Sequence, residues 1–389
     1  MLFLLFRNNL SYCRIAGASR KLPQDWMEKK QRINNTVEET QLDKWVDGIK
    51  IPGIVDQRWV NSDHVPFTVE CVGEFSWGIR NTGGAQVGTG GYEKQRFTVQ
   101  LSITKDGRKL PIFFIFKGAT PKKGKDGQPP PPLRVNSVAL ELARRLPDKF
   151  GNHYPPADKA VLRCAPKANS NQELTKDILE SVIFPHIGIN DGHRAGVLLD
   201  DFKAHSADTV KEITTSKKSG SDDTPENERY NLCEVRIIPG GITMKAQPID
   251  AFIAKVVKGY YKDSYDQYSL TAPTNPTTGH PIPPSRQLCA SWVVEAFDKL
   301  PTELIKKAWQ VCGYKSREDI LSDNNTSLTE YSDEEAVSIL AASVGGGDHG
   351  AQITFYLNQE QTEVLVGKEG EEIDHDMDEH GTWAPPASI

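Results

Sequence analysis

The stretch VLLDDFKAHSADTV, residues 197–210, runs from an apolar segment straight into two adjacent carboxylates, Asp200 and Asp201. The apolar residues indicate a buried strand, and the acids at its end admit two interpretations. In the first, the strand simply ends there and both acids are solvated. In the second, the strand tip holds a carboxylate for a metal ion, since hard cations prefer oxygen ligands. The choice depends on where the other acids of the chain lie.

Composition limits the class of protein. A chain of 389 residues can form one large domain or two smaller ones, and 38% hydrophobic with 25% charged residues is typical of a soluble protein. Six cysteines without a C-x-x-C pair argue against a disulfide framework or a zinc site and favour the cytosol or nucleus. No apolar stretch approaches the roughly 20 residues of a membrane-spanning helix, and MLFLLF at the start is too short for a signal peptide.

Charge is distributed unevenly along the chain. Residues 315–389 carry 17 acids against three basic residues, whereas residues 1–314 carry a net charge of +8. A basic body with an acidic tail is expected of a protein that binds nucleic acid or another polyanion. A mildly basic enzyme with a solubilising tail has the same distribution, so charge alone leaves both interpretations open.

Periodicity and turn residues predict a mixed α/β organisation. An Asp-Gly turn between two apolar runs predicts a hairpin over 96–116. The polar run 216–229 and the proline-rich run 121–133 indicate surface loops, and residues from about 318 onward are expected to be mostly disordered. The other expected elements are helices at 21–46, 172–184, 248–262, 291–300 and 302–314, and strands at 194–201 and 234–239.

Three acids are placed where they could converge. Asp200 ends a predicted strand, and Asp63 follows a short segment that is a second candidate strand. Asp250 lies in the first turn of the helix that begins near Pro248. Acids from separate elements of an α/β core could bind a divalent cation, and two such ions can act on a phosphodiester. Solvated strand ends and helix caps remain the alternative for each acid taken alone.

Several ordered motifs resemble one known family. NSDHVP (61–66), LLDDFKAH (198–205) and IIPGGITMKAQPIDAFIAKVVKGYYK (237–262) are similar, in order and content, to motifs of the DDE-type endonuclease domain of the pogo/Jerky branch of the Tc1/mariner transposases. Between them, GYEKQRFTVQLSITKDGRKLPIFFIFKG (91–118) resembles the hairpin that follows the first acid in that family. The resemblance extends from about residue 55 to 265, and residues 291–314 resemble the helical pair that follows.

The resemblance implies an RNase H-like α/β fold, with a mixed central sheet flanked by helices. It implies that Asp63, Asp200 and Asp250 are the catalytic residues and bind Mg²⁺ or Mn²⁺, as two ions, with no small-molecule cofactor. Asp201 is then expected on the opposite face of the strand. His205 matches the family's histidine after the second acid, as either a packing residue or a contributor to the site.

The implied partner is DNA in the nucleus, acted on by a chain that could be a homodimer. Phosphate contacts that do not read sequence are expected from basic side chains of the body. The lysines expected to make them are Lys117, Lys203, Lys255 and Lys258.

The sequence also departs from the family. His64-Val65 stands where the family has Glu-Thr, and the polar run 216–229 lengthens the interval between the second and third acids. Residues 1–20 resemble only the last part of a CENP-B-type helix-turn-helix. The expected organisation is therefore this remnant at 1–20, a helical linker at 21–54, the endonuclease domain at 55–265, trailing helices at 266–314 and an acidic tail at 315–389.

Three functions fit the sequence. The first is a metal-dependent DNA endonuclease or strand transferase derived from a transposase. The second is a domesticated or decayed transposase that binds DNA without catalysis. The third is a nuclease acting on RNA or on RNA–DNA hybrids, which only the core geometry supports. The intact set of three acids favours the first, and the truncated DNA-binding segment favours the second.

Overall fold

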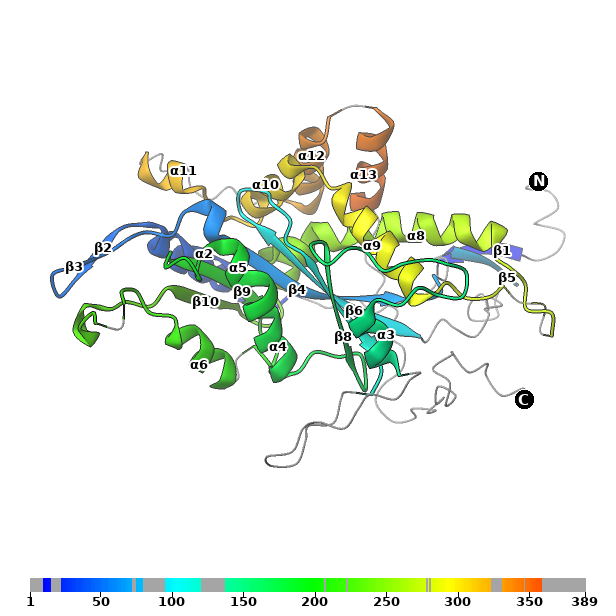
Figure 1. The fold of residues 1–389 in the computed structure, drawn as a ribbon. Coiled ribbons are helices and arrows are strands. Elements are labelled where there is room, and N and C mark those ends of the chain that lie inside the picture. The colour runs from blue at the N-terminus through cyan, green and yellow to red at the C-terminus, as the bar shows by residue number, and fades with distance from the viewer. Residues whose placement is uncertain are drawn as a thin grey trace, which may run out of the picture.

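Six strands form one mixed sheet through the centre of the molecule, in the order β10-β9-β4-β6-β7-β8 (Figure 1). β4, β6 and β7 form an antiparallel meander, whereas β8 pairs parallel with β7, β9 with β4, and β10 with β9. Their bounds are β4 Trp59–Thr68, β6 Arg96–Thr104, β7 Ile112–Lys117, β8 Ala160–Ala165, β9 Ala195–Asp200 and β10 Cys233–Ile238.

The structure, a computed structural model, describes residues 10–14, 22–71, 75–79, 95–119, 137–205, 208–221, 223–277, 279, 281–322, 331–345 and 347–358. The expected proline-rich loop at 121–133 lies outside these residues. The predicted hairpin is confirmed as β6 and β7, and Gly107 in its turn has a φ of 93°, which favours glycine.

Helices cover both faces of the sheet, because alternate strand residues are apolar on both sides. Leu198 and Phe114 face a cluster that includes residues of α8, α9 and α10, whereas Val197 and Phe113 face a cluster built on α4, α5 and α6. This two-sided core confirms the predicted α/β class, with a mixed central sheet flanked by helices. The helix bounds on these faces are α3 Val138–Arg144, α4 Gln172–Ile178, the π-helix η2 Leu179–Ile183, α5 Phe184–Ile187, α6 Asp208–Ser216, α7 Thr243–Ala246, the π-helix η4 Ile249–Ile253, α8 Ala254–Thr271, α9 Arg286–Asp298 and α10 Thr302–Val311.

The N-terminal expectations are partly wrong. The expected helix 21–46 is α2 Trp26–Gln41, and it is followed by a small hairpin of β2 Lys44–Val46 and β3 Ile49–Ile51. An Asp-Gly turn with positive φ at Asp47 and Gly48 joins these two strands, and a continuous helix could not accommodate it. Within the expected helix-turn-helix remnant, the described residues form β1 Leu10–Arg14, a strand paired with β5 Phe75–Ile79.

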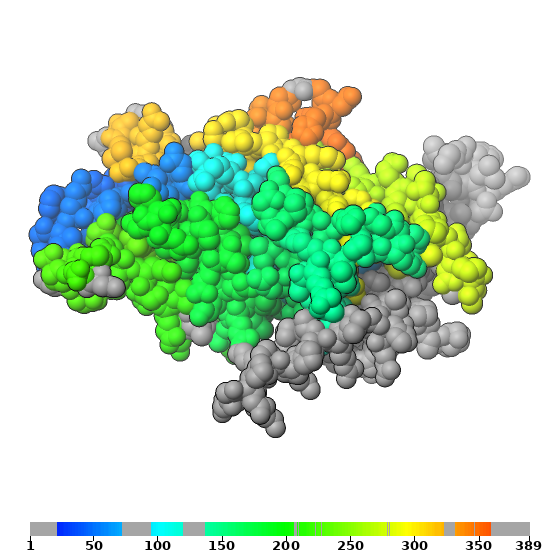
Figure 2. Space-filling model, in the orientation of Figure 1, coloured from blue at the N-terminus to red at the C-terminus, as the bar shows by residue number. Residues whose placement is uncertain are grey.

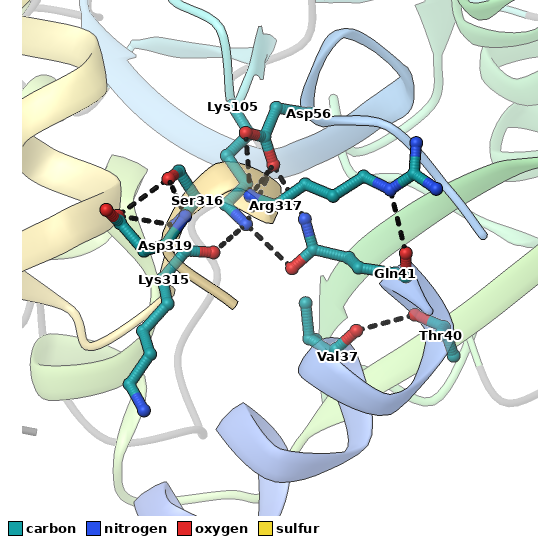
Figure 3. Close-up of polar contacts among 9 residues, drawn as sticks. All are labelled: Val37, Thr40, Gln41, Asp56, Lys105, Lys315, Ser316, Arg317 and Asp319. Carbon is teal, nitrogen blue, oxygen red and sulfur yellow. Dashed lines mark hydrogen bonds and ion pairs between the residues drawn. The ribbon is translucent and has the colours of Figure 1, made fainter. Parts of the chain in front are cut away.

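A buried polar network holds the N-terminal helix, the β6–β7 turn and the chain after α10 together (Figure 3). The Lys105 ammonium contacts Asp56 Oδ1 at 3.0 Å, Gln41 Oε1 at 2.9 Å and the carbonyl of Lys315. The backbone N–H of Arg317 donates to Asp56 Oδ2 at 3.0 Å. Because Lys105 is 6% exposed, this network anchors α11 Arg317–Leu321 and the 3₁₀-helix η1 Asp56–Arg58 to the body.

The expectation of disorder from about residue 318 is wrong for part of this region. α12 Asp333–Ser343 and α13 Asp348–Asn358 are helices that pack on α10 and α8, and Figure 2 shows them seated on the surface of the body. Leu340, Ile353 and Tyr356 are buried in the core cluster of the body. The capping box between Ser332 and Glu335 was the available sequence signal, and the acidic composition obscured it. Residues 359–389, the rest of the expected tail, lie outside the described residues.

Among the described residues, no helix is long and apolar enough to cross a membrane.

The contact between α13 and α8 predicts how one added methyl group at Gly259 changes the stability of the fold. A Cβ added at Gly259 would lie well inside van der Waals contact of the Tyr356 ring. Gly259→Ala should therefore lower the free energy of unfolding by about 1–3 kcal/mol through overpacking, although alanine is the better helix former. Thermal or urea unfolding measures this change.

The matched control is the same substitution in a Tyr356→Ala background. There the ring is absent, and the gain in helix propensity of about 1 kcal/mol should make Gly259→Ala neutral or stabilising. If Gly259→Ala stabilises the otherwise unaltered chain, α13 does not pack on α8.

Candidate active site

The sheet register brings the first two acids together. In the parallel pair β4–β9, Asn61 lies opposite Leu198, so Asp63 and Asp200 each follow two residues later on their own strand. Residues two apart on a strand point to the same face, and aligned residues of adjacent parallel strands share that face. Asp63 and Asp200 therefore project to one side of the sheet.

The side-chain amide of Asn61 positions the third acid. Its Nδ2 donates to the carbonyl of Leu198 on β9 at 3.2 Å, and its Oδ1 accepts the backbone N–H of Ile249 at 3.1 Å. Ile249 is the first residue of η4, and Asp250 follows it. Asn61 is fully buried, so one side chain joins β4, β9 and the helix start that carry the three acids.

Asp63 and Asp250 lie within side-chain hydrogen-bonding reach of each other, and Asp200 is close enough to act on both electrostatically. Burial, followed by the neighbouring Asp250 and Asp200, raises the pKa of Asp63 well above its usual value. Burial and the charge of Asp200 also raise the pKa of Asp250, although hydrogen bonds from Asp63 and Thr243 and the charge of Lys258 oppose this. The three predicted acids thus form one cluster.

The chemistry of this cluster fits a divalent cation. Asp63 is 3% exposed, its Oδ1 accepts the backbone N–H of His64 at 2.7 Å, and its Oδ2 receives no hydrogen bond from any described donor. Closely spaced carboxylates repel one another unless a proton or a cation lies between them, and oxygen ligands suit hard cations. The arrangement can therefore hold a divalent metal.

Asp200 also contacts a histidine. His205 Nδ1 lies 2.7 Å from Asp200 Oδ1, and the His205 side chain is fully buried. The two residues are joined by a short turn after β9, in which the backbone N–H of His205 donates to the carbonyl of Phe202 at 2.8 Å. Asp201, by contrast, is exposed and just beyond the strand end.

His64 lies next to the acids, although its sequence position alone did not identify it as a site residue. Its ring stacks on that of His205, with centroids 5.2 Å apart and an interplanar angle of 10°. Phe202 packs edge-on against both rings. Burial, and secondly the charge of His205, lower the pKa of His64 to about 3, so the imidazole is neutral at neutral pH. Its position directly after Asp63 was the only signal in the sequence.

The four lysines expected to contact DNA lie in three different parts of the structure. Lys258, half-buried on α8, is close enough to the acids to lower the pKa of Asp250, and Lys255 lies one turn before it on the same helix. Lys203 is exposed in the turn between Asp200 and His205. Lys117 is exposed at the end of β7, and strand β6 separates it from β4.

Fold and site together define the class of this protein: a mixed α/β domain in which two strands of the central sheet and the start of a helix bring three aspartates together. A family model, the DDE superfamily endonuclease, matches residues 94–309. The chain belongs to this family, which confirms the resemblance seen in the motifs.

Two known proteins are similar to this chain. The mouse protein "Pogo transposable element with KRAB domain" is 24% identical over 276 residues, which is 70% of this chain and 38% of that protein. The human protein of the same name is 24% identical over 258 residues, 66% of this chain and 35% of that protein. The chain thus spans little more than a third of the length of these relatives.

Solved structures of Mos1 transposase are also similar. The paired-end complex with the left transposon end matches with a TM-score of 0.40 and 9% identity, over 80% of this chain and 67% of that one. The catalytic domain of the Mos1 mariner transposase matches with a TM-score of 0.35 and 12% identity, over 81% of this chain and 99% of that one.

The raised pKa values predict a pH-dependent effect of Asp63→Asn without metal. A carboxyl whose pKa is higher in the folded state contributes stability at low pH, and loses it as pH rises through the folded pKa. In EDTA, the parent chain should therefore lose stability between acidic and neutral pH, and Asp63→Asn should melt higher than the parent at pH 7. The amide can donate to Asp250 and keeps an oxygen for the His64 N–H.

This difference should shrink as the pH falls to about 4 and below, because the unfolded state of the parent then also binds the proton. Thermal melts across that range measure it, with the exposed Asp201→Asn as the matched control. An equal or lower melting temperature for Asp63→Asn at pH 7 would show that the acids do not repel one another.

Proposed function

We propose that this domain is a metal-dependent DNA endonuclease and strand transferase, with Asp63, Asp200 and Asp250 as its metal-binding catalytic residues. The observation that carries the proposal is the convergence of these carboxylates from β4, β9 and η4 in a chain that belongs to the DDE endonuclease family. Mg²⁺ or Mn²⁺, bound as two ions, is the cofactor of the proposed reaction. Such ions activate a water or a 3′-hydroxyl and stabilise the charge on the phosphodiester oxygens.

The protein residues have defined parts in this proposal. Asp63 and Asp250 lie within hydrogen-bonding reach of each other and Asp63 Oδ2 receives no hydrogen bond from a described donor, so a cation bound here would replace a proton on this pair. His205 holds the Asp200 carboxylate through its Nδ1 contact and is a positioning residue. Asn61 fixes the separation of the three elements and touches no reacting atom.

The proposed substrate is DNA, held through its phosphates. Lys258 and Lys255 on α8 and Lys203 beyond β9 would contact the backbone near the acids, and Lys117 would contact it further along the sheet. Such contacts give salt-dependent affinity without reading sequence. The net charge of +8 over residues 1–314 supports this substrate, as do the pogo relatives. Nuclear localisation and a homodimer are further parts of the proposal and rest on the family resemblance.

The test is a nicking assay on supercoiled DNA with Mg²⁺ or Mn²⁺. Asp200→Ala should reduce the nicking rate on the order of 1,000-fold, because a metal ligand contributes several kcal/mol of transition-state stabilisation. Asp201→Ala is the matched control. It removes an exposed carboxylate one residue further along the chain and should leave nicking nearly unchanged.

Thermal melts of both variants exclude unfolding as the cause. Equal loss of nicking in the two variants would mean that Asp200 is not the metal ligand. DNA binding without nicking by the parent chain would contradict the enzyme and leave a DNA-binding protein without catalysis.

A further inference from the structure

We propose that His64, His205 and Asp200 form a second, nitrogen-containing metal site, which prefers a transition cation such as Co²⁺ or Zn²⁺ to Mg²⁺. The site shares Asp200 with the acid cluster and takes its other two ligands from imidazoles. It lies on β4 and on the turn after β9, and so on the same paired strands as the proposed catalytic centre.

The geometry places the ligand atoms together. One ligand atom from each of the three residues lies within 4.8 Å of the other two. The Nε2 atoms of His64 and His205 are both buried, and neither has a hydrogen-bond partner among the described residues. A buried polar atom without a partner costs about 1–3 kcal/mol, and a cation bound at His64 Nε2 would offset that cost at this nitrogen.

The contact between His205 and Asp200 brings two of these ligands together. His205 Nδ1 lies 2.7 Å from Asp200 Oδ1 and 3.2 Å from the backbone carbonyl oxygen of Asp200. The imidazole nitrogen and the carboxylate oxygen are therefore close enough to bind one cation. The edge-on contacts of Phe202 with both rings restrict their rotation.

The ligand types determine which cation binds. Mg²⁺ requires oxygen ligands and retains its water molecules, whereas imidazole nitrogen suits zinc and the later first-row transition metals. A set of two imidazoles and one carboxylate with a position left open resembles zinc sites that keep an exchangeable ligand. The structure therefore offers two metal-binding chemistries beside each other, one made of oxygens and one containing nitrogens.

A titration of the full chain with Co²⁺, followed by its visible absorption, tests the proposal. The parent chain should bind Co²⁺ with the absorption of a cation bound by imidazole. His64→Gln and His205→Gln should each weaken binding by more than about tenfold. His153→Gln, which removes an exposed histidine, is the matched control and should leave affinity unchanged.

Asp250→Asn separates this site from the acid cluster. It removes a carboxylate of the proposed catalytic centre but no ligand of the new site, so Co²⁺ affinity should be retained while Mg²⁺ binding weakens. Loss of Co²⁺ in Asp250→Asn with retention in His64→Gln would place the ion on the acids and overturn the proposal. The absence of Co²⁺ binding by the parent chain would overturn it as well.

Circular dichroism confirms that each variant is folded. Should the buried His205→Gln fail to fold, the half-buried His64→Gln decides the result alone. The readout is metal affinity, so failure of the nicking assay leaves this inference standing, and failure of Co²⁺ binding leaves the proposed endonuclease standing.

Discussion

The side-chain amide of Asn61 is the interaction on which the candidate centre depends. It bonds to β9 through Leu198 and to the start of η4 through Ile249, while its own strand carries Asp63 two residues later. Three like-charged groups would otherwise move apart, because each gains by becoming solvated. A neutral, fully buried amide with both ends satisfied holds these elements together without adding charge to the cluster.

The packing of the rest of the fold must offset the unfavourable free energy of burying these acids together. Asp63 is buried beside two other carboxylates, which is unfavourable without a cation. The sheet that carries it has a hydrophobic cluster on each face, and the helices of both layers contribute to them. A strained or repulsive site supported by a well-packed scaffold is the usual compromise between stability and function. The C-terminal helices α12 and α13 belong to this support, since Leu340 and Tyr356 extend one of the two clusters.

Much of the fold could be predicted from local sequence patterns, whereas the choice of Asp63, Asp200 and Asp250 came from the resemblance of ordered motifs to a known family. The turn at Asp106-Gly107, the apolar run before Asp200 and the helix after Pro248 are local signals, and the structure has an element at each. The hairpin at 44–51 was missed because a helical pattern precedes it. Residues 333–358 were missed because their charge indicated disorder, whereas a few apolar side chains suffice when a core already exists to receive them.

The pairing of His64 with His205 could not be predicted, because it depends on tertiary contact. The two residues are far apart in sequence, and only the register of β4 against β9 brings their rings together. The same holds for Asn61, which from the sequence is one polar residue in a strand. Periodicity predicts which face of an element is buried, but not which residue of another element it contacts.

The central claim is that Asp63, Asp200 and Asp250 jointly bind divalent metal. A crystal structure of the chain soaked with Mn²⁺, with anomalous scattering recorded to locate the metal, tests it most directly. The account predicts anomalous density between the three carboxylates, with Asp63 and Asp250 moved apart to accommodate it. Density elsewhere on the protein, and none between the three carboxylates at high Mn²⁺ concentration, would contradict it.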